Sequence, residues 1–138
     1  MMNTQLTVII PVFNEINSIE QLLIKVLNNK IDKQIIVVDD HSSDGTRELL
    51  INKFKNKIDK IIFHQKNLGK GAAIKSAQKY IIGKYTIIQD ADLEYDPSDY
   101  LSLINEAKKN EFQVVYGSRV LNKNMHTNIK NFSHQIRI

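Results

Sequence analysis

Three acidic side chains, spaced two residues apart, follow an apolar segment in the second half of the chain. Asp90, Asp92 and Glu94 come directly after residues 85–89, whose apolar and β-branched side chains predict a buried strand. Because side chains alternate along an extended segment, this spacing places the three carboxylates on the same side. Neighbouring carboxylates repel one another, and oxygen ligands favour Mg²⁺ or Mn²⁺ over zinc. The segment therefore predicts a divalent-cation site, and the alternative is an ordinary charged loop before the next helix.

A second acidic pair, Asp39 and Asp40, follows the apolar residues 34–38. Turn and helix-cap formation account well for residues 42–46, Ser-Ser-Asp-Gly-Thr, which are typical of both. They do not account for two adjacent carboxylates after an apolar strand, where the first would lose its hydration unless it bonds to something. We therefore expect this pair to have a specific polar partner.

Three further polar segments carry weaker signals. Residues 11–15, Pro-Val-Phe-Asn-Glu, follow the first apolar run of the chain. Residues 67–71, Asn-Leu-Gly-Lys-Gly, place glycines and Lys70 at a helix start, where backbone N–H groups can approach an anion. Arg119 follows the last predicted strand and has a planar fork that suits a phosphate, although an isolated arginine is more often a surface residue.

Several kinds of chemistry are excluded or unsupported. The chain has no cysteine, which excludes disulfides and thiolate metal sites. It contains neither the P-loop spacing nor the Gly-x-Gly-x-x-Gly fingerprint of dinucleotide sites, and no serine stands in a nucleophile elbow. His41 and His64 have no partner at a metal-ligating spacing, so we expect both to be structural.

Strand-length apolar runs alternate with helical periodicity along the chain and position these side chains. Strands, expected to be buried on both faces, are predicted at residues 6–12, 34–39, 60–64, 85–89 and 112–116. Helices are predicted from Ile19 after a cap at Asn17 or Ser18, from Ser43 or Asp44 to Phe54, from Gly71 to Tyr80, and from Asp96-Pro97 to Ala107.

The resulting βαβαβαβαβ order predicts an α/β fold with a mostly parallel sheet and helices on both faces. Ligands of such folds bind outside the carboxyl ends of the strands, which is where the polar clusters stand. With 138 residues and 42% hydrophobic side chains, the chain suits one domain with a real core.

The membrane signals of the sequence are weak. Its longest apolar runs are far below the roughly 20 residues that span a bilayer, and the start has no signal-peptide pattern, so we expect a cytoplasmic location. After Glu111 the chain has no acidic residue and has four basic ones, Arg119, Lys123, Lys130 and Arg137. Such a tail is typical of a solvated face, and it also suits an anionic lipid or phosphate partner.

Taken in order, these segments resemble family 2 glycosyltransferases of the GT-A fold, and among them the dolichyl-phosphate mannosyltransferases and bacterial polyprenyl-phosphate glycosyltransferases. Five matching segments cover nearly all of the chain from Leu6 to Leu121, namely Val8 to Glu15, Ile36 to Thr46, Asn67 to Ala73, Gln89 to Pro97 and Val115 to Arg119. One such motif alone would be a weak signal, whereas five in this order are a strong one.

The resemblance implies specific roles for these residues. The nucleotide-sugar pocket would involve Pro11, Phe13, Asn14, Glu15, Val38, Asp39, Asp40, Lys70, Asp90 and Ala91. Asp39 or Asp40 would bond the base or ribose, and Asp92 and Glu94 would hold Mg²⁺ or Mn²⁺ against the diphosphate. Asp92 and Arg119 would act in catalysis, with Arg119 neutralising charge on a phosphate.

The implied activity is inverting transfer of a sugar from a nucleoside-diphosphate sugar, of the GDP-mannose or UDP-glucose type, to a polyprenyl phosphate. A hydroxyl acceptor would need a general base, whereas a lipid phosphate is already anionic. The partners would be the donor and the polyprenyl phosphate at the cytoplasmic face of the membrane, with no nucleic acid. Two alternatives remain: transfer to a saccharide hydroxyl in cell-surface polysaccharide synthesis, or a nucleotide-binding module without turnover.

The resemblance also divides the chain. Residues 1–121 would form the nucleotide-sugar-binding domain, and residues 122–138 would begin an incomplete acceptor-side region. The family continues beyond this length, so we expect the chain to be an N-terminal fragment that binds the donor without transferring sugar.

Overall fold

A parallel sheet of four strands forms the centre of the computed structural model, which describes residues 4–111. The strands lie in the order β3-β2-β1-β4 and are β1 (Leu6–Val12), β2 (Lys33–Asp39), β3 (Lys60–Phe63) and β4 (Tyr85–Ile88). All three pairings are parallel, with Val12 beside Asp39 and Ile9 beside Ile88. The predicted α/β fold is therefore confirmed, and the strand predicted at residues 112–116 lies outside the described residues.

Burial differs between the central and the flanking strands. Every residue of β1 is buried, as is every residue of β2 after Lys33. The residues of β3 and β4 are only partly buried, although the sequence predicted burial on both faces. Within the described residues each of these two strands pairs on one side only, which leaves more of its surface accessible.

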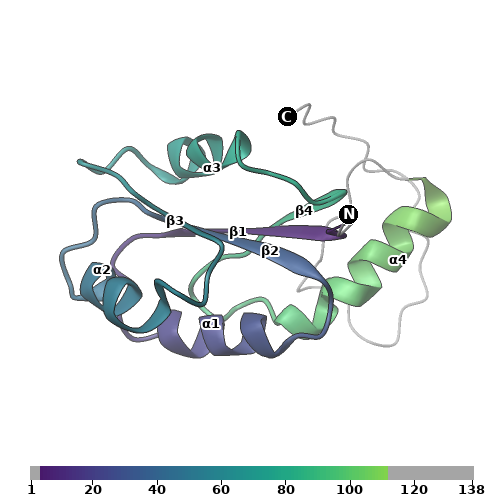
Figure 1. Ribbon diagram of the computed structural model, residues 1–138, viewed down its shortest axis with the longest axis horizontal. Coiled ribbons are helices and arrows are strands. Elements are labelled where there is room, and N and C mark those ends of the chain that lie inside the picture. Colours follow the sequence, from purple (N-terminus) through teal and green to yellow (C-terminus); the bar gives the residue numbers. More distant parts are fainter. Residues whose placement is uncertain (1–3, 112–138) are drawn as a thin grey trace. The chain divides into compact units, whose positions relative to one another are not determined.

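The helices pack on both faces of the sheet, as predicted. Figure 1 shows α1 (Ile19–Asn28) and α2 (Thr46–Leu49) on one face and α3 (Lys70–Gln78) on the other. On the α3 face, Ala73 and Ala77 pack with Ile9, Ile36 and Val38 in a buried cluster. The small alanines let this helix lie close to the sheet and hold its first residue, Lys70, near the strand ends.

Two helix starts differ in detail from the predictions. The second helix begins at Thr46 and continues as a π-helical turn, η1 (Leu50–Phe54). The fourth begins with a 3₁₀ turn, η2 (Pro97–Asp99), where Asp96 Oδ1 accepts a 2.9 Å hydrogen bond from Ser98 N. The helix α4 (Tyr100–Asn110) follows, with Tyr100 and Ile104 buried. None of the helices within residues 4–111 is long and apolar enough to cross a membrane.

The turn before β4 passes very close to the backbone at the start of β1. A Cβ atom added at Gly83 would lie 2.4 Å from Thr7 N and 2.5 Å from Leu6 C, both backbone atoms of the β1 segment. We expect Gly83→Ala to lower the free energy of unfolding by at least about 2 kcal/mol, because overpacking there must shift backbone. Urea unfolding followed by circular dichroism measures the loss.

Gly71→Ala is the matched control for this substitution. Nothing lies within 4 Å of a Cβ at Gly71, which stands inside α3. Alanine should there raise the free energy of unfolding by up to about 1 kcal/mol through helix propensity. A Gly83→Ala variant as stable as the parent chain would contradict the close approach of this turn to β1.

Candidate functional site

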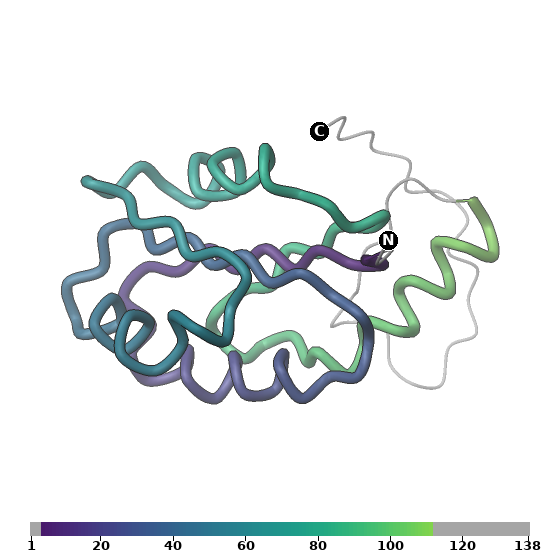
Figure 2. The backbone as a smooth tube through the Cα atoms, in the orientation of Figure 1, coloured from purple at the N-terminus to yellow at the C-terminus, as the bar shows by residue number. Residues whose placement is uncertain are grey.

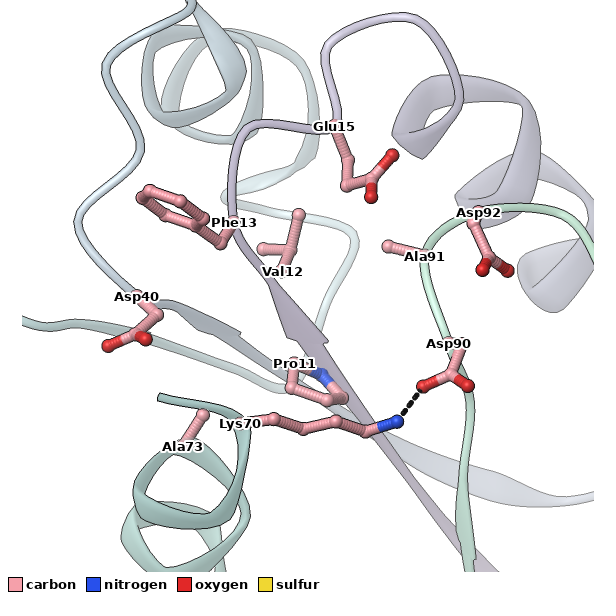
Figure 3. Close-up of a pocket in the computed structure, with 10 residues that line it drawn as sticks. All are labelled: Pro11, Val12, Phe13, Glu15, Asp40, Lys70, Ala73, Asp90, Ala91 and Asp92. Carbon is pink, nitrogen blue, oxygen red and sulfur yellow. Dashed lines mark hydrogen bonds and ion pairs between the residues drawn. The ribbon is translucent and has the colours of Figure 1, made fainter. Parts of the chain in front are cut away.

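The carboxyl ends of β1 and β4 and the start of α3 enclose a pocket of about 270 Å³ (Figure 3). Its lining consists of Pro11, Val12, Phe13, Glu15, Asp40, Lys70, Ala73, Asp90, Ala91 and Asp92. Eight of the predicted site residues are therefore brought together, at the edge of the sheet where the topology places ligands. Asn14, Val38, Asp39 and Glu94 are not among the lining residues, and Arg119 lies outside the described residues.

The pocket is strongly acidic. Among the described residues, four carboxylates line it, from Glu15, Asp40, Asp90 and Asp92, against the single ammonium group of Lys70. Lys70 Nζ forms an ion pair with Asp90 Oδ1. Phe13, at the edge of the pocket, leaves 46% of its surface exposed, so a flat apolar ligand group could pack on its ring.

The segment after β4 is a turn, which corrects the predicted convergence of three carboxylates. Leu93 has a positive φ of 65°, and Asp92 Oδ1 accepts a 3.1 Å hydrogen bond from Glu94 N. The alternation of an extended chain is therefore lost, and only Asp90 and Asp92 line the pocket. Within residues 4–111, no group of three or more Asp, Glu or His side chains is gathered closely enough to hold a metal ion.

Gln89 stabilises this turn through two side-chain hydrogen bonds, a role that the sequence did not predict. Its side chain is buried, and Nε2 donates hydrogen bonds of 3.1 Å to the carbonyl oxygens of Asp90 and Tyr95. One buried amide thus spans the turn from its first residues to its last. The signal available in the sequence was a polar residue at the end of an apolar strand.

Asp39 has a charged partner within the protein. The carboxylate is fully buried, and Oδ2 lies 2.7 Å from Arg47 Nε. Arg47 Nη2 also donates a 2.7 Å hydrogen bond to the carbonyl oxygen of His64, so the pair ties β2 to the end of β3. Val38, the residue before, is buried in the cluster beneath α3. The polar partner expected for the acidic pair exists, but at Asp39 it is an internal one.

Asp40 lines the pocket and also fixes the loop between β3 and α3. Its buried carboxylate accepts hydrogen bonds from His64 Nδ1 at 2.7 Å, Leu68 N at 2.8 Å and Gly69 N at 2.7 Å. Burial raises the pKa of Asp40, but these hydrogen bonds outweigh it and hold the pKa below its ordinary value. Asp40 therefore stays ionised and holds the loop that leads into Lys70.

Of the two histidines near strand ends, His64 has structural contacts in the part of the chain that the structure describes. His64 is buried between Asp40 and Ser76, with Nε2 lying 2.8 Å from Ser76 Oγ on α3. His41 is exposed and has a positive φ of 69°, in the turn that follows the acidic pair.

The loops that follow β1 and β2 lie side by side (Figure 2). Hydrogen bonds join the two loops. Three consecutive backbone N–H groups, of residues 14–16, donate to Ser42 Oγ at 2.9 Å, Thr46 Oγ1 at 3.0 Å and Asp44 Oδ2 at 3.0 Å. Residues interpreted from sequence as turn and cap formers therefore also position the Phe13 and Glu15 edge of the pocket.

The side chain of Asn14 adds a fourth hydrogen bond between the same two loops. Its Oδ1 accepts a 2.8 Å hydrogen bond from Ser43 N, and its φ of 52° is one that asparagine tolerates better than most residues. Asn14 thus shapes the pocket without lining it.

Comparisons with known proteins show which proteins this chain is similar to. The chain is 33% identical over 132 residues to a dolichyl-phosphate beta-glucosyltransferase of Dictyostelium discoideum, covering 85% of this chain and 40% of that protein. It is 33% identical over 117 residues to a dolichol-phosphate mannosyltransferase of Pyrococcus furiosus, covering 83% and 33%. The chain thus spans two fifths or less of the length of these relatives.

A solved structure with the same fold is the mannosyltransferase PcManGT from Pyrobaculum calidifontis in complex with GDP-Man and Mn²⁺. It is 26% identical to this chain with a TM-score of 0.58, over 64% of this chain and 27% of that one. The model of the family described as glycosyl transferase family 2 matches residues 7–137. This chain therefore belongs to glycosyl transferase family 2 and has its GT-A fold.

Proposed function

We propose that this chain forms the donor-binding part of an inverting glycosyltransferase. The reaction would move a sugar from a nucleoside-diphosphate sugar to a polyprenyl phosphate at the membrane surface. The observation that carries the proposal is the acidic pocket at the carboxyl ends of β1 and β4, where three aspartates, one glutamate and one lysine meet. The relatives named for dolichyl-phosphate transfer support the lipid acceptor, and the neighbour bound to GDP-Man supports the donor.

The charge of the pocket indicates how a diphosphate could enter it. Four carboxylates and one ammonium would repel an anionic ligand. A divalent cation bound between the carboxylates and the diphosphate would attract both and so remove this repulsion. Asp90 and Asp92 fit such a cation, because Mg²⁺ in nucleotide sites is bound by one or two carboxylates together with phosphate oxygens. The Mn²⁺ in the structural neighbour supports the same assignment. When bound, the cation would neutralise charge on the departing diphosphate.

The remaining roles follow from where the side chains lie. The exposed ring of Phe13 would pack against the base, and Lys70 would add a positive charge beside the diphosphate. Arg119 keeps its predicted role of neutralising charge on a phosphate, and Glu94 keeps its predicted role as a further ligand of the cation beside Asp92. An acceptor phosphate would attack the anomeric carbon from the face opposite the diphosphate, which inverts that carbon and needs no general base.

The first test of this function is the metal dependence of nucleotide binding. Calorimetric titration of the chain with GDP and, separately, UDP should show affinity at least about tenfold higher in Mn²⁺ than in EDTA. The reason is that the acidic lining repels the diphosphate without a cation. The arm with the higher affinity identifies the base. Equal affinity with Mn²⁺ and with EDTA would contradict the proposed role of the carboxylates.

Asp92→Asn isolates the charge of one proposed metal ligand. The amide keeps an oxygen that can accept the hydrogen bond from Glu94 N, and Asp92 is exposed, so the turn should persist. We expect the Mn²⁺-supported affinity for the nucleotide to fall at least about tenfold, while urea unfolding stays unchanged.

Asp99→Asn is the matched control, since Asp99 is an exposed aspartate in η2 that does not line the pocket. Its nucleotide affinity should equal that of the parent chain. Loss of secondary structure in Asp92→Asn, or an effect shared by both variants, would show that the charge of Asp92 has no specific role in binding.

A further inference from the structure

Among residues 4–111, Lys70 is the only basic residue that lines the pocket, and its charge is paired with a carboxylate of the same pocket. The ammonium pairs with Asp90 Oδ1, and Figure 3 shows the side chain extending from α3 past Pro11 to reach it. Asp90 is one of the two carboxylates assigned above to the cation. The pair therefore joins a group proposed to bind metal with a group proposed to bind phosphate.

The two ends of Lys70 differ in how firmly they are held. Its backbone follows Leu68 and Gly69, whose N–H groups both donate to the buried Asp40 carboxylate at 2.8 Å and 2.7 Å. Its side chain is 57% exposed, and that of Asp90 is 30% exposed. The backbone of Lys70 is thus held in place, whereas its long side chain forms an ion pair that is accessible to solvent. Such exposed pairs are weak and exchange readily for stronger partners.

A divalent cation and an ammonium group compete for the same carboxylate. A cation bound at Asp90 repels Lys70 Nζ, while a diphosphate bound to that cation offers new oxygen acceptors within the same pocket. We propose that Lys70 exchanges partners: it neutralises Asp90 in the empty pocket and moves to the diphosphate when the cation takes Asp90. This inference rests on the proposed function, because it assumes that the pocket binds a cation and a nucleotide together.

The exchange couples the two ligands in a definite direction. Before nucleotide arrives, Lys70 opposes cation binding, because the cation must first displace the ammonium from Asp90. Once both are bound, Lys70 adds a charge-assisted hydrogen bond to the phosphate. The pocket therefore holds a free cation weakly and a cation–nucleotide complex firmly, and by linkage each ligand strengthens binding of the other.

Lys70→Met tests this exchange, because methionine keeps much of the aliphatic length and removes the charge. In the variant, Mn²⁺ alone should bind about two- to fivefold more tightly, as measured by loss of the free-ion electron paramagnetic resonance signal. In saturating Mn²⁺, the affinity for GDP or UDP should fall about tenfold or more by calorimetry. The two affinities must change in opposite directions.

Two further variants separate the exchange from a general charge effect. Lys66→Met removes an exposed lysine of the same loop that does not line the pocket, and neither affinity should change. In an Asp90→Asn background, Lys70→Met should no longer raise the affinity for Mn²⁺, because the competing pair is already absent. Circular dichroism of each variant checks that the fold is intact.

The outcomes also distinguish this inference from the function on which it rests. A parent chain that binds neither Mn²⁺ nor nucleotide overturns both. If the parent chain binds both, the proposed function stands. In that case the exchange alone is overturned when Lys70→Met changes both affinities in the same direction, changes only one of them, or changes neither.

Discussion

The central position of β1 is the constraint on which the rest of the structure depends. Its pairing with β2 over seven residues and with β4 over four is parallel on both sides, so the carboxyl ends of three strands meet at one edge. Parallel pairing also requires a crossover between strands, and those crossovers become the helices that cover both faces. The pocket follows from this arrangement, because the residues after β1, those after β4 and those at the start of α3 all lie at this edge of the sheet.

The acidic residues at this edge form two groups, which differ in burial and in the hydrogen-bond partners of their carboxylates. Asp39 and Asp40 are buried and bonded to Arg47, to His64 and to backbone N–H groups, so they hold loops in place. Asp90 and Asp92 are more exposed and stand on a turn braced by Gln89. The buried carboxylates thus hold the loops around the pocket, and the more accessible ones are those that we propose to bind the cation.

The α/β order, the four strands within residues 4–111 and the place of the pocket were predictable, because hydrophobic periodicity and polar strand ends report directly on a parallel sheet. The shape of the segment after β4 was not. Its spacing suggested an extended chain, whereas Leu93 adopts a left-handed conformation that depends on local turn chemistry. The partner of Asp39 was equally hidden, since Arg47 is eight residues away and only the fold brings it to the carboxylate.

A paramagnetic map of the bound cation tests most directly whether the acidic pocket binds the cation together with the nucleotide. Mn²⁺ with GDP or UDP, added to ¹⁵N-labelled protein, should broaden amide signals of residues 12–15, 69–73 and 90–92 first, since these surround the pocket. Signals near a second groove, lined by Ile51, Ile58 and Phe63, should stay sharp. Broadening centred on that groove, or no selective broadening at all, would contradict binding at the acidic pocket.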